Sequence, residues 1–277
     1  MRMTELRNHP FLAIAAILVL VLLITRIPIK EHLPASDFAS AEMEGILIST
    51  ALVCTLVFII RKLRVPHSYF AVLDPRVYLY YLPALVLALL PAHRLSLLLH
   101  PGGSIVDPGS LLLYGTARLA RALFEEVLFR GAIFGLLLAT FYGSRNGILK
   151  SVVISGALFG IVHISNVWTQ PGHDAGVVTT QVYAAACLGV LYCATYLKTR
   201  SIVVLGIIHF VNNFFAKLDE LGVHGKVVES LEHQSTIAET IASNMLGLVY
   251  YGLPLLAGLY IVKKISEGDV KRFLGLS

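Results

Sequence analysis

The sequence has little charge for its length. Of its 277 residues, 56% are hydrophobic and only 14% are charged, whereas a soluble globular domain has about 25% charged residues. A soluble protein of this size has too small an interior to bury so much apolar surface. The composition therefore excludes an ordinary soluble globular protein and indicates that the lipid bilayer is the solvent.

Signals of several other protein classes are also missing. Cys54, Cys187 and Cys193 all lie inside apolar runs, so we expect neither a disulfide framework nor a cysteine metal cluster. The basic residues flank apolar runs and do not interleave with aromatic residues, which argues against nucleic-acid binding despite the net charge of +5. The first apolar run follows Arg2 and Arg7 but has no adjacent A-x-A-type cleavage site. We therefore expect it to be a retained membrane anchor rather than a signal peptide.

Long apolar runs are what the sequence does contain. A transmembrane helix needs about 20 mostly apolar residues, and eight runs come near that length. They are residues 11–29, 43–60, 77–92, 117–142, 149–168, 175–197, 201–217 and 241–262. These runs are too long and too apolar for the strands of a membrane barrel. We therefore predict an all-α, polytopic membrane protein with about eight transmembrane helices, which form a single domain over residues 1–277.

The lysines and arginines in the connections predict the orientation. With the N-terminus inside, fourteen of them fall in the inside connections and five in the outside ones. The positive-inside rule favours this arrangement, so we predict a multi-pass protein with both termini in the cytoplasm. This orientation places Glu125 and His163 toward the outer ends of their spans and His209 near the middle.

Three ionisable residues interrupt the fourth run. In the stretch EEVLFR, Glu126 and Arg130 are four residues apart, so they share a helix face and can form an ion pair. Glu125 points about 100° around the helix and has no partner in its own segment. Each charge at the centre of a bilayer costs roughly 2.5–3.5 kcal/mol. The structural alternative is an ion pair or a turn at the membrane edge, which the nearby Arg118 and Arg121 favour.

Two later runs carry polar pairs at helical spacing. The stretch FGIVH places Phe159 four residues before His163, and HFVNN places His209 four residues before Asn213. A single histidine in a membrane helix is more often a packed core residue than a functional one. Residues four apart share a helix face, however, and polar groups from three apolar helices satisfy one another only by converging. We therefore predict one cavity that contains both histidines, Asn213 and Glu125.

Small residues also occur at helical spacing in the fifth run. Gly156 and Gly160, in the stretch GALFG, make a face without side chains. Such a face lets two membrane helices approach closely. We interpret it as a packing surface.

In this order, EEVLFR, FGIVH and HFVNN resemble the E-E-x-x-x-R, F-x-x-x-H and H-x-x-x-N motifs of the CPBP family. These are the CAAX-protease and bacteriocin-processing intramembrane proteases, also called Abi or Rce1-like. The resemblance spans residues 125–213 and implies a conical intramembrane cavity with a catalytic core at about 117–217. It implies an intramembrane endopeptidase that cleaves a membrane-associated peptide or protein near its C-terminus or at a membrane-proximal site. The implied location is a bacterial or archaeal cell membrane.

Peptide hydrolysis requires an activated water, a stabilised oxyanion and a proton for the leaving amine. The resemblance assigns the first two of the following residues to the water and the last two to the oxyanion: Glu125, His163, His209 and Asn213. It assigns structural support of the site to Glu126, Arg130 and Phe159.

Three alternatives accompany this interpretation. A glutamate and two histidines can bind zinc, but the sequence has no H-E-x-x-H motif, so we favour a metal-free glutamate mechanism without a cofactor. A proton-coupled transporter also buries Glu, Arg and His, but transporters usually show repeats or interrupted helices in matched halves. A catalytically silent scaffold or immunity protein has no need of an intact set of motif residues. The sequence does not select between prenylated and other membrane-associated substrates.

Overall fold

The structure, a computed structural model, describes residues 9–25, 37–69, 75–93, 107–169, 175–218, 221 and 237–276. These ranges contain helices and no strand. In chain order the helices are α2 (Pro10–Ile24), α3 (Asp37–Lys62), η2 (Pro75–Tyr81), α4 (Leu82–Leu89), α5 (Pro108–Glu126), η4 (Val127–Phe134), α6 (Gly135–Phe141), α7 (Gly147–Ile161), η5 (Val162–Ser165), α8 (Asn166–Thr169), α9 (Ala175–Thr199), α10 (Ile202–Ala216), α12 (Ile237–Lys263) and α13 (Glu267–Leu274). The prediction of an all-α membrane protein is confirmed.

Each of the eight predicted runs contains a helix. Four helical segments in the described ranges are long and apolar enough to cross a bilayer: Phe38–Lys62, Pro75–His93, Gly147–Ser165 and Gly176–Thr199. Three more are apolar but shorter, namely Pro10–Ile24, Ile202–Ala216 and Val249–Lys263. The helix of the fourth run is long but carries the ionisable residues of the EEVLFR motif. Every predicted run therefore holds a helix in the described ranges, and eight crossings stay a prediction.

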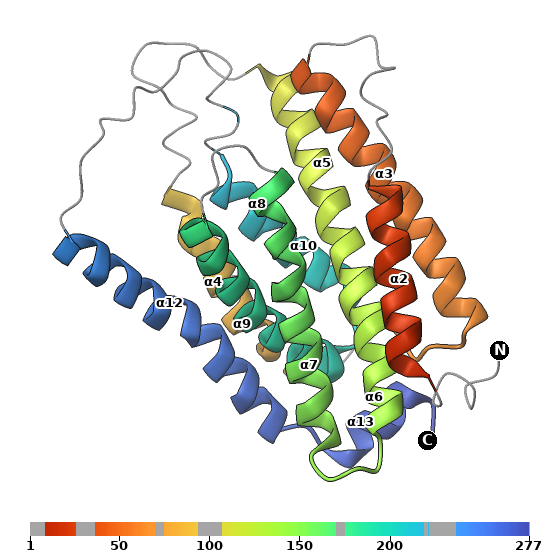
Figure 1. Cartoon of the computed structure of the whole chain (residues 1–277). Helices are drawn as coiled ribbons and strands as arrows, with labels where there is room; N and C mark the ends of the chain where they lie inside the picture. Colours follow the sequence, from red (N-terminus) through yellow and green to blue (C-terminus); the bar gives the residue numbers. More distant parts are fainter. Residues whose placement is uncertain are drawn as a thin grey trace.

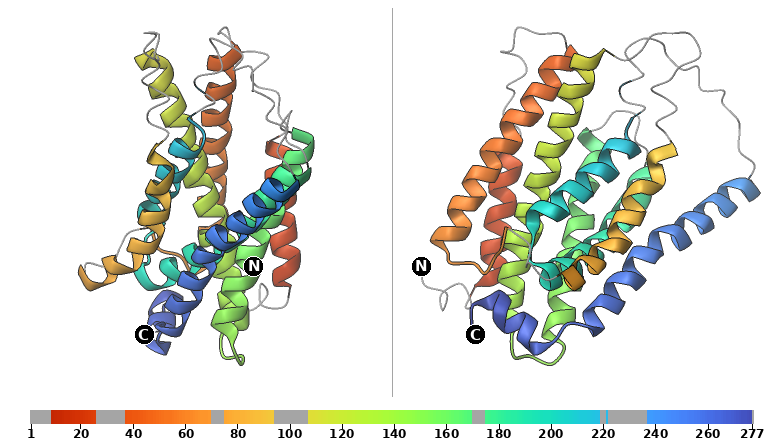
Figure 2. Two further views of the ribbon diagram at one scale, coloured as in Figure 1. Left: turned by 90° about the vertical axis from the view of Figure 1, so that its left-hand side faces the viewer. Right: turned by 180° about the vertical axis from the view of Figure 1, so that it is seen from behind.

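The helices form a bundle in which α5 occupies a central place (Figure 1). It packs on α3 on one side and on α10 on the other, while α7 packs on α9 and α9 packs on α12. The side view in Figure 2 shows α12 passing obliquely across the bundle, and the view from behind shows it slanting along one side. We call the end of the bundle that carries α13 and the connection from α6 to α7 the lower end. Helix α2 begins and α13 ends there (Figure 1).

The helix of the fourth run begins before its predicted start at residue 117. Asp107 caps it by accepting a hydrogen bond from the Ser110 backbone N–H at 2.8 Å, and Pro108 supplies the first helical residue. The chain then continues through α5, η4 and α6, which have 19, 8 and 7 residues. At about 1.5 Å per residue this helix is roughly 50 Å long. Glu125 and Glu126 therefore lie near its midpoint.

Glycines set the close contact between α7 and α9. A Cβ on Gly156 would lie 2.8 Å from the Val190 backbone nitrogen, and one on Gly160 would lie 2.5 Å from the Val182 carbonyl oxygen. Gly189 faces Gly156 across the same interface. The predicted packing role of Gly156 and Gly160 is confirmed, and the neighbour is α9.

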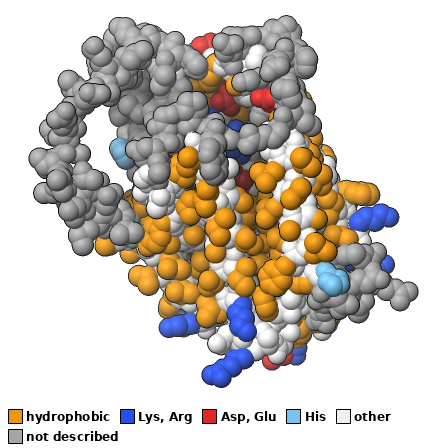
Figure 3. All heavy atoms as spheres, in the orientation of Figure 1, with side chains coloured by type: hydrophobic (Ala, Val, Ile, Leu, Met, Phe, Trp, Pro, Cys, Tyr) orange, Lys and Arg blue, Asp and Glu red, His pale blue; other side chains and the backbone are white. Residues whose placement is uncertain are grey.

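Charge is distributed unevenly over the surface. Figure 3 shows hydrophobic side chains in a broad band over the helices, with Lys and Arg below it at the lower end. A positive lower end is what the connection charges predicted. Lys198 of α9, Lys264 just after α12 and Arg272 of α13 all lie there. Several residues of the charge count, such as Arg2, Arg26 and Arg94, lie outside the described residues. Which side of the membrane the lower end faces stays a prediction.

Candidate functional site

A polar cluster lies near the middle of the long central helix. It consists of Glu125, Glu126 and Arg130 from α5 and η4, with His209 from α10, and we call it the mid-span cluster. His209 Nδ1 lies 2.8 Å from Glu126 Oε1. Arg130 Nε lies 3.1 Å from Glu126 Oε2, and both of these side chains are 0% exposed. The predicted pairing of Glu126 with Arg130 is therefore present, and His209 is a second partner of the same carboxylate.

Glu125 differs from its neighbour in both exposure and contacts. Its side chain is 19% exposed, and its Oε2 lies 3.6 Å from His209 Nε2. This distance is longer than a hydrogen bond. Glu125 does point away from Glu126, as the helical geometry predicted, but it faces the imidazole that Glu126 holds from the other side. His209 therefore lies between two carboxylates.

Aromatic rings hold the guanidinium of Arg130. The Phe159 ring lies 4.6 Å from the Arg130 Cζ and the Tyr192 ring lies 5.1 Å from it. The contact with Glu126 is close but lacks the alignment of a hydrogen bond, and within the described residues Nη1 and Nη2 have no hydrogen-bond acceptor. Charge proximity and two cation–π contacts therefore stabilise this arginine.

Tyr192 of α9 was missed by the sequence reasoning. It contacts Arg130, and its ring centroid lies 5.7 Å from that of His209. The available signal was a tyrosine in the interior of a predicted span, because a buried tyrosine usually has a polar partner. The sequence reasoning treated the run 175–197 only as an apolar span, so this signal was not used.

Phe159 connects the second histidine to the cluster. Its ring packs edge-on against both His163 and His209, with centroids 5.2 and 5.9 Å away. The half-buried His163 has its Nδ1 2.8 Å from the Phe159 carbonyl oxygen. A carbonyl only accepts, so Nδ1 carries the proton, and the Nε2 of a neutral imidazole is left with its lone pair. His163 thus reaches the mid-span cluster through Phe159.

Asn213 lies one turn beyond His209 on α10 and is half-buried. Within the described part of the chain it makes no hydrogen bond with the mid-span cluster. The structure therefore brings these residues into contact with one another: Glu125, Glu126, Arg130, Phe159 and His209. His163 contacts this group through Phe159, and Asn213 lies one helical turn from His209.

The local backbone of the cluster is unusual. The segment directly after Glu126, η4, is a π-helix, and all eight of its residues are buried. Wide turns of this kind occur often at functional sites. Gly135, just after it, lies so close to the segment that follows α3 that an added Cβ would be 2.5 Å from the Pro66 carbonyl oxygen. The π-helix and Gly135 therefore pack tightly against the end of α3 and the residues after it, and no sequence pattern predicted the π-helix.

Glu125, Glu126 and His209 also raise the question of a metal. In the ranges that the structure describes, no group of three or more His, Cys, Asp or Glu side chains is arranged to hold a metal ion. Two of the candidate ligands already interact with each other, since Glu126 binds His209 directly. The expectation of a mechanism without a metal stays a prediction.

Part of the chain matches a known protein family. Residues 107–215 match the family described as "Type II CAAX prenyl endopeptidase Rce1-like". This range begins at the cap of α5 and ends within α10, so it contains all three motifs and the mid-span cluster. Comparisons with curated proteins and with solved structures gave no match.

Proposed function

We propose that this chain, whose residues 107–215 match the Rce1-like family of type II CAAX prenyl endopeptidases, cleaves a membrane-associated peptide or protein with a water activated by Glu125. The family itself implies a protease of the membrane. The observation that carries the finer proposal is the division between two adjacent carboxylates. Glu126 is fully enclosed and bound to both Arg130 and His209, whereas Glu125 is partly accessible and makes no contact shorter than 3.6 Å with the imidazole.

Glu125 is the general base in this proposal. An ionised carboxylate that is reachable and not engaged in a hydrogen bond can take a proton from a water as that water attacks a peptide carbonyl. His163 assists, because its Nε2 lone pair can accept the second hydrogen bond of the same water. When the tetrahedral intermediate collapses, the C–N bond breaks and the proton held by Glu125 passes to the leaving amine.

His209 stabilises the oxyanion in this proposal. Its Nδ1–H donates to Glu126, so donation from Nε2 requires the doubly protonated imidazolium. Glu126 supplies the negative charge that such an imidazolium needs, and Arg130 limits the charge imbalance around Glu126. Asn213, one turn along α10, supplies an amide donor to the same oxyanion. Glu126 and Arg130 are then positioning residues rather than participants in bond breaking.

The substrate side of the proposal follows from the position of the site. A cluster near the midpoint of a roughly 50 Å helix acts on a peptide that is held in the membrane or at its surface. Cleavage near a C-terminus or at a membrane-proximal bond fits this position. We propose both termini in the cytoplasm from the basic lower end, so that the half of the bundle with His163 faces outward.

The experiment that tests the proposal is cleavage of a library of membrane-tethered peptides, prenylated and not, by purified protein in lipid nanodiscs. Glu125→Gln preserves the shape of the side chain but removes the base, so we expect turnover to fall at least about 100-fold. The matched control is Glu267→Gln, which removes an exposed glutamate on α13 far from the cluster. Both variants are expected to unfold at the wild-type temperature.

Two outcomes would count against this function. If Glu125→Gln retains near-normal turnover, Glu125 is not the base. If the wild-type protein cleaves no peptide while a substrate gradient across vesicles drives transport, the buried ionisable groups belong to a transporter instead.

A further inference from the structure

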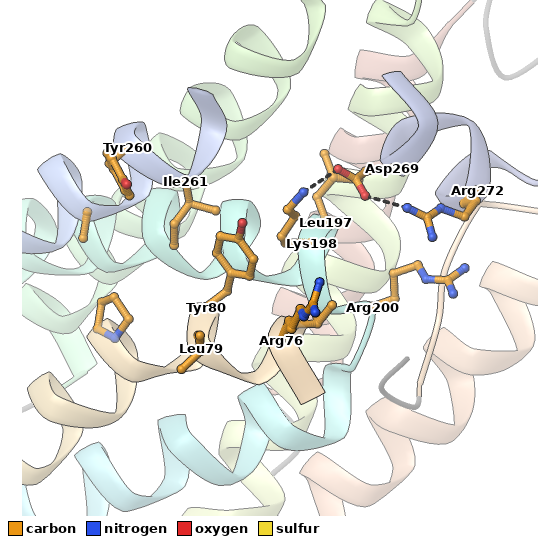
Figure 4. Close-up of a pocket in the computed structure, with 13 residues that line it drawn as sticks. Arg76, Leu79, Tyr80, Leu197, Lys198, Arg200, Tyr260, Ile261, Asp269 and Arg272 are labelled. Carbon is orange, nitrogen blue, oxygen red and sulfur yellow. Dashed lines mark hydrogen bonds and ion pairs between the residues drawn. The ribbon is translucent and has the colours of Figure 1, made fainter. Parts of the chain in front are cut away.

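A second polar region lies at the lower end of the bundle, away from the mid-span cluster. There, the structure has an open pocket of about 670 Å³, lined by η2, α4, α9, the Arg200 connection, α12 and α13. We call it the lower pocket. Figure 4 shows the side chains that line it, with Lys198, Asp269 and Arg272 linked by hydrogen bonds and ion pairs. The proposed peptidase chemistry makes no use of it.

One wall of the lower pocket is strongly cationic. Arg76, Lys198, Arg200 and Arg272 line it together with a single acidic residue, Asp269. The four cations and one carboxylate leave an excess of three positive charges. The sign of this wall therefore favours an anionic occupant.

Asp269 is fully engaged with its neighbours. Its Oδ2 lies 2.6 Å from Lys198 Nζ, and its Oδ1 lies 2.9 Å from Arg272 Nη2. Burial alone would raise the pKa of Asp269, but the hydrogen bonds from Lys198 and Ser266 outweigh it and hold the pKa below its usual range. This one carboxylate is therefore shared between two cations and does not neutralise the wall.

The other wall of the lower pocket is apolar. Leu79 and Pro83 come from η2 and α4, and Ala257 and Tyr260 come from α12. Leu79 and Tyr260 are largely exposed, and the exposed apolar surface continues along α12 at Leu256. A hydrophobic path thus leads from the cationic wall onto the surface that faces the bilayer.

The backbone fixes one of the cations. Arg200 lies in the two-residue connection between α9 and α10 and has a left-handed backbone with φ of 56°. Ser201, next to it, caps α10 by accepting a hydrogen bond from the Val204 backbone N–H at 3.3 Å. Because this connection has only two residues, the two helices set the position of the Arg200 backbone.

We propose that the lower pocket binds the headgroup of an anionic phospholipid, with its phosphate on the cationic wall and its acyl chains on the apolar path. A basic pocket between membrane helices at the end of a bundle is suited to such a headgroup. An anionic soluble ligand would use the cationic wall alone, whereas a lipid uses both walls. The bound lipid bridges η2, α9 and α13 and thereby stabilises the docking of α13 against the bundle.

The test is native mass spectrometry of the purified full chain in a neutral detergent, titrated with phosphatidylglycerol or with phosphatidylcholine of the same acyl chains. We expect phosphatidylglycerol to bind and phosphatidylcholine to bind far more weakly. Arg76→Gln with Arg200→Gln should weaken phosphatidylglycerol binding about 25-fold, since each cation contributes roughly a fivefold factor near a lipid surface. The matched control is Arg145→Gln with Lys150→Gln, which removes two exposed cations at the same end outside the pocket.

Three results would overturn the proposal. An equal loss in the control variant would reduce the effect to general attraction between a basic surface and an anionic lipid. Displacement of the lipid by millimolar glycerol phosphate would assign the cationic wall to a soluble phosphate. Arg76→Lys with Arg200→Lys changes the same two side chains but keeps their charges. Failure of this double variant to bind the lipid as the wild type does would contradict the charge argument. The assay needs no peptidase turnover, so its outcome is separate from that of the proposed function.

Discussion

Two arginines of this molecule lie about one helical turn from a carboxylate, and their surroundings differ. Arg130 is 3.1 Å from Glu126 in the mid-span cluster, where both side chains are 0% exposed. Arg272 is 2.9 Å from Asp269 at the lower pocket, where the arginine is 55% exposed. The separations are similar, but only in the first pair have both ions been removed from water, since Asp269 is buried and Arg272 is not.

This difference separates two uses of charge. An exposed pair costs little to form and contributes little, because water solvates both ions anyway. A buried pair has lost that solvation, and the loss is recovered only through close partners. The mid-span cluster supplies them with His209, Phe159 and Tyr192 around one ion pair. A buried ion pair with so large a desolvation cost is consistent with a catalytic role for the mid-span cluster. The exposed arginine of the lower pocket is consistent with binding at a membrane surface.

The largest expected effect comes from the same substitution made at both arginines. Arg130→Ala leaves Glu126 buried beside aromatic rings and should lower the free energy of unfolding by about 3–5 kcal/mol. Arg272→Ala removes the exposed partner of Asp269, which keeps its hydrogen bond with Lys198, and should lower it by at most about 1 kcal/mol. Denaturant titration of both variants in the same mixed micelles measures the difference. If both variants lose the same free energy of unfolding, the burial of an ion pair does not determine how much it contributes to stability.

A smaller effect is expected from adding one methyl group in each region. Gly156→Ala places a Cβ 2.8 Å from the Val190 backbone nitrogen, so α7 and α9 must separate. Overpacking of this kind costs about 1–3 kcal/mol. Gly268→Ala on α13 meets only the Ser266 Oγ at 3.7 Å, and alanine favours helix, so its stability should stay equal or rise slightly.

The readout is again the free energy of unfolding, measured for both glycine variants together. Turnover of the two variants gives a second comparison. Phe159 of α7 contacts Arg130, so a shift of α7 also disturbs the mid-span cluster. Gly156→Ala should therefore reduce turnover as well as stability, whereas Gly268→Ala should not. A neutral Gly156→Ala would show that the interface of α7 and α9 relaxes easily.

The smallest expected effect is none. If Glu125 and His163 activate the water without a metal, extensive dialysis against a chelator should leave turnover unchanged, and elemental analysis should find no stoichiometric zinc. Loss of turnover that zinc restores would favour a metalloprotease. The cluster contains two glutamates and His209, so the measurement bears on the mid-span region directly.

The sequence was sufficient to predict the helices and the ion pair within one of them. Apolar runs of sufficient length allow no other backbone structure in a bilayer, and Glu126 and Arg130 pair within a single helix. The extent of the central helix was not predicted, because its beginning depends on the cap at Asp107 rather than on apolar residues. The charges of Arg118 suggested a membrane edge, but this side chain is buried against Glu42 of α3 at 3.1 Å.

The partners of the mid-span cluster depend on contacts between distant segments. Helical spacing could show that Glu125 and Glu126 point in different directions, but not that His209 lies between them. The contact of Tyr192 with Arg130 depends on the close approach that Gly156 and Gly189 permit between α7 and α9, together with the packing of α9 near η4. Such contacts require the tertiary arrangement, and one sequence without relatives contains no direct record of it.

The central helix also has a consequence for how the protein is made. Five ionisable residues, from Arg118 to Arg130, are synthesised before α10 emerges, and His209 follows Glu126 by 83 residues. Glu42 precedes them and is available to Arg118 at once. Each charge costs roughly 2.5–3.5 kcal/mol to move to the bilayer centre, so this helix is not expected to enter the bilayer from the translocon without its partner helices. We expect it to wait beside the insertion machinery until the ribosome has delivered α10, so that a nascent chain stalled before residue 202 leaves α5 accessible to water.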